Sequence, residues 1–155
     1  MEHYSMTEVI GQAVQTEKLG RQFYESMAAR FPEETKMKAL FEDLAAKEVE
    51  HEETFAKLQG MVKGEEAPVD WEEVSKYLRA IVESEFFLGK NKSLPSLTHV
   101  DTVAAAIKFA IGFEKESLLY YYALREAIGE REIMGKIIAE ERSHIVWLTD
   151  LSEKI

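Results

Sequence analysis

The sequence predicts an all-helical bundle of four long helices, arranged as two antiparallel hairpins joined by one long crossover. The composition suits such a fold, because 46% of the 155 residues are hydrophobic, 31% are charged, and only eight are Gly and three Pro. Apolar residues recur at helical spacing through four segments of about 25 residues, each close to 40 Å long as a helix. Short breaks separate the first segment from the second and the third from the fourth. Roughly 40 residues lie between the pairs, enough to cross the bundle from end to end.

The first hairpin is expected to begin near Ser5 or Thr7, because Ser5 opens a Ser-x-x-Glu capping box. Its first helix should run to about Arg30. Pro32 breaks that helix and suits the first turn of the next one, which we expect to reach Gln59.

The crossover, residues 60–98, should contain a shorter helix from Trp71 to about Glu83, capped by Asp70. Its apolar side chains are more numerous than a loop needs. They either cover one face of the bundle or form a homodimer contact, and the sequence alone leaves both open.

The second hairpin is expected to start at a Thr-x-x-Asp capping box on Thr98, with its first helix ending before Gly129. The last helix should end close to Ile155. One domain over 1–155 accounts for the whole length.

Each apolar stripe is interrupted near mid-helix by an acid, or by an acid and a histidine. In chain order these residues read Glu, Glu-x-x-His, Glu, Glu-x-x-His. The residues of the two halves are offset by 97 positions in the first helix of each hairpin and by 93 in the second. The six candidates are Glu17, Glu48, His51, Glu114, Glu141 and His144. The remaining histidines, His3 and His99, fall outside the stripes.

A structural explanation has to be weighed first. Chance alone gives about 0.65 Glu-x-x-His matches in a chain of this composition, and one acid in a stripe usually means a misphased helix. Six residues at similar depth, repeated in both halves, are not explained that way. Four unpaired carboxylates in an apolar core would each cost several kcal/mol, whereas two divalent cations would neutralise them. The sequence has no cysteine, so oxygen and imidazole ligands are expected, which suit iron or manganese better than zinc.

Tyr24 and Tyr121 share the 97-residue offset and lie two helical turns beyond the acids of their helices. Core packing with a buried hydroxyl is the simpler account of both. A second-shell or radical role near the metals is the alternative.

Four segments make the chain resemble rubrerythrin and related ferritin-like di-iron carboxylate proteins. They are Thr16 to Gly20 with Phe23 and Tyr24, Lys47 to His51, Phe113 to Ser117 with Tyr120 and Tyr121, and Glu140 to His144. The resemblance covers most of the chain and implies a ferritin-like four-helix bundle. It also implies that Glu48 and Glu141 bridge two iron ions, that Glu17 and Glu114 are terminal, and that each histidine holds one ion.

The chain departs from the rubrerythrin pattern in two ways. Rubrerythrins add a rubredoxin-like module with four cysteines, so here the resemblance implies an external electron-donor protein. They also carry an extra Glu one turn before the third-helix ligand, linked to a redox-dependent metal shift, where this chain has Ile111.

We therefore expect a cytoplasmic di-iron oxidoreductase that reduces peroxide or O₂, with ferroxidase-type iron sequestration as the alternative. A metal-free bundle that acts through its crossover surface is a third hypothesis. The net charge of −10 argues against nucleic acid and anionic membranes as partners. The N-terminus has no signal-peptide pattern, and no apolar run reaches transmembrane length.

Overall fold

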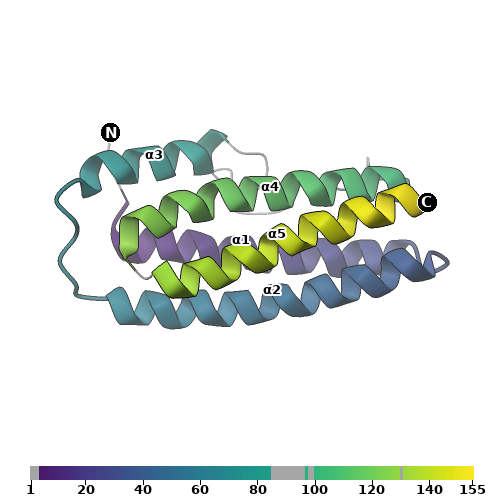
Figure 1. Ribbon diagram of the computed structural model, residues 1–155, viewed down its shortest axis with the longest axis horizontal. Helices are drawn as coiled ribbons and strands as arrows, with labels where there is room; N and C mark the ends of the chain where they lie inside the picture. Colours follow the sequence, from purple (N-terminus) through teal and green to yellow (C-terminus); the bar gives the residue numbers. More distant parts are fainter. Residues whose placement is uncertain (1–3, 85–96, 98–99, 130) are drawn as a thin grey trace.

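The computed structural model describes residues 4–84, 97, 100–129 and 131–155, and these contain five α-helices and no strand (Figure 1). The prediction of an all-α fold with four long helices and one shorter helix is confirmed. The helices are α1 (Met6–Arg30), α2 (Thr35–Val62), α3 (Trp71–Ser84), α4 (Val103–Ile128) and α5 (Arg131–Lys154).

The four long helices lie side by side as two antiparallel hairpins, α1 with α2 and α4 with α5. The chain leaves α2 at one end of the bundle and enters α4 at the opposite end, so the connection between the hairpins spans its length (Figure 1). As a result α1 runs parallel to α5, and α2 runs parallel to α4. One long crossover of this kind is the connectivity of ferritin-like bundles.

The capping box predicted for α1 is present. The Ser5 hydroxyl accepts a hydrogen bond from the Glu8 N–H at 3.1 Å, and the Glu8 carboxylate accepts one from the Ser5 N–H at 3.4 Å. These two bonds satisfy backbone donors that have no partner within the first helical turn. The start of α1 therefore follows from local sequence.

The prediction for Pro32 is wrong, because α2 begins three residues later, at Thr35. Pro32 lies in the tight turn between the helices. The Glu34 N–H donates back to the Phe31 carbonyl at 3.1 Å, which closes the turn around Pro32. Proline has no N–H to give and its φ is fixed, so it fits this turn as well as it fits a helix start.

Three other helix boundaries depend on glycine or on a neighbouring cap. Helix α2 continues past the predicted end at Gln59 to Val62, because Gly60 keeps helical geometry. Helix α4 begins at Val103, where the Thr102 hydroxyl accepts from the Ala105 N–H at 3.1 Å. The predicted cap at Thr98 lies outside the described residues. Gly129 ends α4 as predicted, with φ of 74°.

Helix α3 covers the bundle to which it belongs. Trp71, Leu78 and Ile81 are buried, and the helix packs against α4 and α1. The Trp71 indole donates to the Tyr4 carbonyl at 2.9 Å, tying α3 to the segment before α1. Residues 71–84 therefore cover a face of their own bundle, the first of the two alternatives, and the homodimer contact stays a prediction. The predicted crossover residues 85–96, and the histidines His3 and His99, lie outside the described residues.

The apolar core consists of two clusters, one toward each end of the bundle. One holds Val9, Phe55 and Leu124, and the other holds Phe41 and Leu148, each with many neighbours. On α1, α2 and α5 the predicted acids and histidines lie between the segments that supply the two clusters, and on α4 Glu114 lies where the two segments meet. The polar side chains therefore form a middle layer with apolar packing on both sides.

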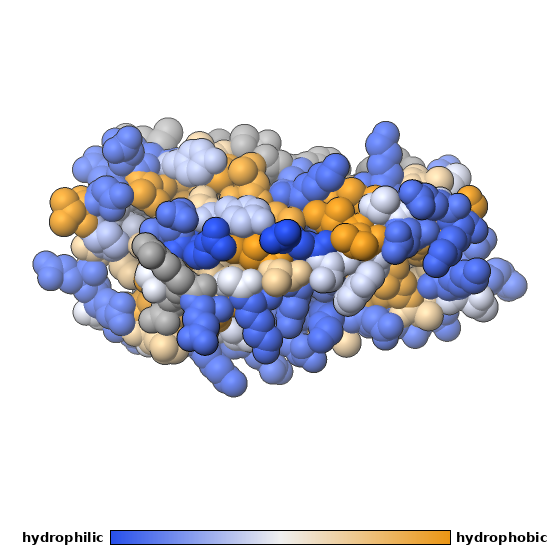
Figure 2. Space-filling view, viewed as in Figure 1, coloured by the Kyte–Doolittle hydropathy of each residue, from blue (hydrophilic) through white to orange (hydrophobic). Residues whose placement is uncertain are grey.

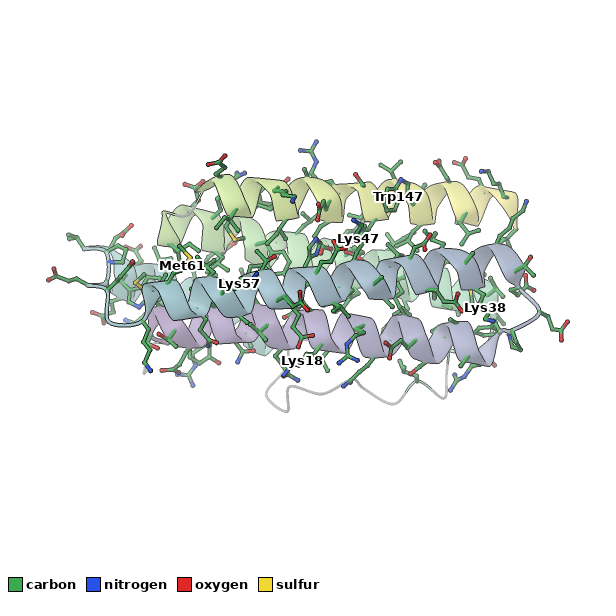
Figure 3. The ribbon with its side chains drawn as sticks, turned by 90° about the horizontal axis from the view of Figure 1, so that it is seen from below. Lys18, Lys38, Lys47, Lys57, Met61 and Trp147 are labelled. Carbon is green, nitrogen blue, oxygen red and sulfur yellow. The ribbon has the colours of Figure 1, made fainter. Side chains whose placement is uncertain are left out.

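The outer face of the bundle carries most of the charge. Lys18, Lys38 and Lys57 point away from the bundle in Figure 3, and hydrophilic residues cover much of the face in Figure 2. Surface ion pairs such as Lys18 with Glu52, at 3.9 Å, contribute little to stability. Among the described helices, none has the length and apolarity needed to cross a membrane.

Candidate metal centre

All six predicted residues meet in the middle layer of the bundle. Helix α1 contributes one carboxylate, α4 contributes one, and α2 and α5 each contribute a carboxylate and an imidazole. None of the six residues is more than 2% exposed. The glutamates are Glu17, Glu48, Glu114 and Glu141, and the histidines are His51 and His144.

The six residues form two overlapping groups, each able to offer four ligand atoms within 4.8 Å of one another. One group contains Glu17 and His51, and the other contains Glu114 and His144. Glu48 and Glu141 belong to both groups. The geometry is therefore that of two adjacent cation positions with two carboxylates between them.

His51 turns its Nδ1 atom inward. This atom lies 2.8 Å from Glu141 Oε1 and 3.6 Å from Glu17 Oε2. The Nε2 atom points the other way and lies 2.5 Å from Oε2 of Glu140, the residue before Glu141. Both ring nitrogens of His51 thus face carboxylates.

His144 also turns Nδ1 inward, at 3.4 Å from Glu114 Oε1 and 3.5 Å from Glu141 Oε2. The rings of His144 and His51 are stacked, with centroids 5.9 Å apart and an interplanar angle of 19°. The His144 ring also lies near the Trp147 ring, at 5.6 Å between centroids. One imidazole therefore belongs to each group, at matching depth.

Two tyrosines connect the hairpins across the centre. The Tyr24 hydroxyl on α1 donates to Glu114 Oε1 on α4 at 2.5 Å. The Tyr121 hydroxyl on α4 donates to Glu17 Oε1 on α1 at 2.7 Å. Both tyrosines are buried. They therefore pack in the core and also contact the acids of the centre. Each bond holds in place a carboxylate that belongs to only one of the two groups, Glu114 in the first case and Glu17 in the second.

Burial and the charges of neighbouring groups shift the pKa values of the glutamates at the centre. Burial, and then the negative charge of Glu141, raise the pKa of Glu114 to about 8. The pKa of Glu48 is raised well above its usual value by burial and by the charges of Glu17 and Glu141. The Glu141 pKa is lowered instead. Burial and the Glu17 charge act to raise it, but hydrogen bonds with Glu114 and both histidines outweigh them.

The pKa values of both histidines are raised as well. Burial lowers an imidazole pKa, but hydrogen bonds with Glu141 and Glu17 outweigh burial and raise the pKa of His51 to about 11. The carboxylates of Glu114 and Glu141, 3.4 and 3.5 Å from Nδ1, outweigh burial in the same way and raise the pKa of His144 to about 10. Protons on the histidines thus substitute in part for cations at this centre.

Several polar atoms at the centre nevertheless lack hydrogen-bond partners among the described residues. They include one oxygen of each of the four glutamates and both ring nitrogens of His144. A buried acceptor without a partner costs roughly 1–3 kcal/mol, and more if it is charged. Divalent cations would satisfy the glutamate oxygens and the inward Nδ1 atom of His144 and would neutralise the charge, so the residues present fit a pair of metal ions.

Gly20 lets the two hairpins approach closely beside the centre. A Cβ atom at this position would lie 2.7 Å from Phe113 Cε1 and 3.2 Å from the Glu48 carboxylate carbon. Only glycine leaves both side chains where they are. The backbone of α1 therefore contributes to the shape of the site.

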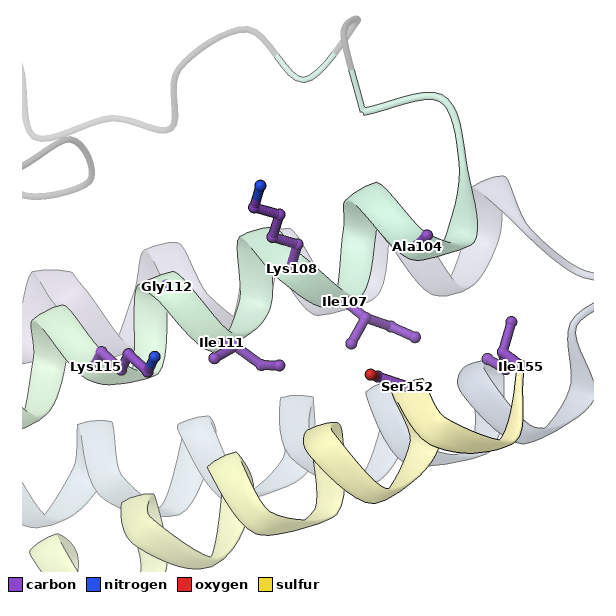
Figure 4. A pocket seen from close by; sticks show the side chains of 8 residues that line it. All are labelled: Ala104, Ile107, Lys108, Ile111, Gly112, Lys115, Ser152 and Ile155. Atoms are coloured by element: carbon purple, nitrogen blue, oxygen red, sulfur yellow. The ribbon is translucent and has the colours of Figure 1, made fainter.

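Two cavities differ in their relation to the centre. One, of about 450 Å³, lies between α2 and α5 and is lined by His51 and Glu140. The other, of about 440 Å³, lies between α4 and α5 and contains none of the six residues (Figure 4). Ile111 lines this second cavity, so the position of the extra rubrerythrin Glu is occupied by an apolar side chain. Of these two cavities, the one beside His51 is lined by a residue of the centre.

The sequence reasoning missed the contact of Glu140 with His51. Its position next to Glu141 is visible in the sequence, but Glu140 lies off the apolar stripe and its side chain is 30% exposed. From the sequence alone, Glu140 cannot be distinguished from the other surface acids. Only the packing of α5 against α2 brings it to the imidazole.

The comparison with protein families agrees with this geometry. The family model named Rubrerythrin matches residues 8–152, nearly the whole chain. The chain belongs to the rubrerythrin family. Rubrerythrins are ferritin-like four-helix bundles that bind di-iron, so the fold and the Glu/His centre agree with this membership. A search of curated proteins and a search of solved structures gave no match.

Proposed function

We propose that this rubrerythrin-family chain is a di-iron carboxylate redox protein that reduces peroxide or O₂ with electrons from an external donor. The observation that carries the proposal is the pair of overlapping buried groups with two shared carboxylates and unsatisfied inward-facing oxygens. Such an arrangement is costly in a metal-free core and favourable around two cations.

Each ligand then has a definite part. Glu48 and Glu141 belong to both groups and would contact both ions, whereas Glu17 and Glu114 would each contact one. Four carboxylates balance two divalent ions, and oxygen and nitrogen ligands without sulfur favour iron, with manganese as the alternative.

A bound iron pair would supply one-electron redox chemistry at each ion. The surrounding side chains hold that chemistry in place. Tyr24 and Tyr121 donate to the terminal carboxylates and restrict their rotation. The apolar clusters on both sides exclude bulk water, and the cavity beside His51 is wide enough for a small oxidant. Because the sequence has no cysteine, we propose that the donor is a separate molecule.

Iron oxidation for sequestration is the second candidate. It is favoured by the acidic lining of the cavity beside His51, where Glu50, Glu132 and Glu140 would attract Fe²⁺. Under this alternative the centre passes oxidised iron onward, whereas under the first proposal the ions stay and turn over.

Anaerobic loading with Fe²⁺ followed by elemental analysis tests the centre directly. We expect two ions per chain in the wild type. Glu48→Gln should lose more iron than Glu17→Gln, because its carboxylate serves both ions, and the exposed Glu126→Gln should lose none. A stoichiometry near zero in the wild type would refute the metal centre, and equal losses in the two site variants would refute the bridging role.

Peroxide consumption separates the two functions. The loaded protein is mixed with peroxide and a chemical reductant, and both turnover and bound iron are followed. Repeated turnover with iron retained supports the peroxidase-type function. A single round of oxidation followed by release of ferric iron from the site would support sequestration instead.

A further inference from the structure

The two histidines of the centre occupy equivalent positions but differ in what their outer ring nitrogens meet. His51 Nε2 lies 2.5 Å from the Glu140 carboxylate. His144 Nε2 has no hydrogen-bond partner among the described residues, although it is fully buried and its ring packs against Trp147. The two halves of the chain therefore match in the six candidate ligands but differ in what the outer nitrogen of each histidine contacts.

The sequence explains why the second half has no matching carboxylate. Glu140 precedes Glu141, and the residue at the corresponding position before Glu48 is Lys47. A lysine ammonium group can only donate hydrogen bonds, so it could not accept one from a metal-bound imidazole. Lys47 instead pairs with Glu50, at 3.4 Å.

Metal binding places a requirement on the outer nitrogen. If the inward Nδ1 atom of His51 binds a cation through its lone pair, the ring proton must be on Nε2. A carboxylate that accepts a hydrogen bond from this Nε2–H group fixes the tautomer and the ring orientation, and it makes Nδ1 a better electron-pair donor to the metal. Glu140 lies where it can accept this hydrogen bond whether the His51 imidazole is neutral or protonated.

We propose that Glu140 is a positioning residue that orients His51 and thereby strengthens the cation position formed with Glu17, leaving the His144 position unaffected. This rests on the proposed metal centre. The two positions are then unequal in affinity, and a residue outside the ligand set determines the difference.

Co²⁺ titration of the purified chain, followed by its visible absorption and by competition with a chelator, tests the proposal. The wild type should bind two ions. In Glu140→Ala one of them should bind about 10- to 100-fold more weakly. Glu140→Gln, which keeps an acceptor oxygen and the side-chain shape, should show a smaller loss at the same position. Glu132→Ala removes an acid from the lining of the same cavity and should change either affinity by less than about fivefold.

Proton NMR of the Co²⁺-loaded protein identifies the histidine involved. Two exchangeable ring N–H signals are expected, one from each imidazole, and Glu140→Ala should shift or broaden only one. The signal that stays unchanged should be the one close to the Trp147 ring, which lies 5.6 Å from His144. A merely structural effect of Glu140 would alter both signals.

The outcomes are distinct. A wild type that binds no Co²⁺ refutes the metal centre and this inference with it. A wild type with two ions, and a Glu140→Ala variant with the same two affinities and both signals, overturns the inference alone. So does equal weakening of both ions. If circular dichroism shows that Glu140→Ala does not fold, Glu140→Gln decides by the same criteria.

Discussion

Glu114 should control much of the pH dependence of the metal-free protein. Burial and the neighbouring charge of Glu141 raise its pKa from 4.5 to about 8. Between these values the folded chain holds a proton that the unfolded chain has lost. The resulting stabilisation is fully present below pH 4.5 and is lost as the pH rises through about 8. The free energy of unfolding should therefore fall by about 1.4 kcal/mol per pH unit within this window.

The perturbation is Glu114→Gln in protein stripped of metal by a chelator, because the amide does not titrate. Between pH 5.5 and 7.5 the stability of the wild type should fall relative to the variant by about 2.7 kcal/mol. His144 acts in the same direction above pH 6.5. Its pKa is raised to about 10, largely through Glu114, and it loses that partner in the variant.

Urea unfolding at pH 5.5, 6.5 and 7.5, followed by circular dichroism, measures the difference. Glu126→Gln, an exposed substitution on the same helix, is the control and should track the wild type at every pH. A difference between wild type and Glu114→Gln that stays constant, or that grows with pH, would refute the reasoning. It would mean that Glu114 does not hold a proton in the folded apoprotein over this pH range.

Two further predictions concern packing around the centre, and both are read from urea unfolding of the metal-loaded protein. Tyr24→Phe removes the hydrogen bond to Glu114 and should cost about 1.5–3 kcal/mol, because the acceptor is a buried carboxylate; a loss below about 0.5 kcal/mol would contradict this. Gly20→Ala should cost about 1–3 kcal/mol, because the new methyl group overlaps the Phe113 ring. Gly112→Ala, in a helix with open space at the Cβ position, should instead stabilise by about 0.5–1 kcal/mol. If both alanine variants moved stability the same way, the close approach at Gly20 would not matter.

The helices and the clustering of the six candidate residues could be predicted from the sequence because both depend on periodicity. Residues three and four apart share a helix face, so an acid or a histidine that falls in an apolar stripe must point inward. His51 and His144 follow their acids by three residues, which places each pair on one face. The repeat between the halves then predicted similar depth for all six candidate residues, and in the structure they lie together.

Boundaries and contacts between helices were less predictable. Pro32 has the same local preference for a turn and for a helix start, and hydrogen bonds of the turn decided between them. The crossed bonds from Tyr24 to Glu114 and from Tyr121 to Glu17 join helices from different hairpins. Which tyrosine meets which acid depends on the register of α1 against α4, and no local pattern records that register.

The sequence by itself determined that four carboxylates and two imidazoles would face a common core, since helical periodicity is a local property of the chain. Only the tertiary structure determined which further residues contact the six residues of the centre and shape the space around them. Glu140 reaches His51 because α5 packs beside α2, and Gly20 matters because α1 lies against Phe113 of α4. Both effects are distances between side chains on different helices, and such distances are set only when the helices pack.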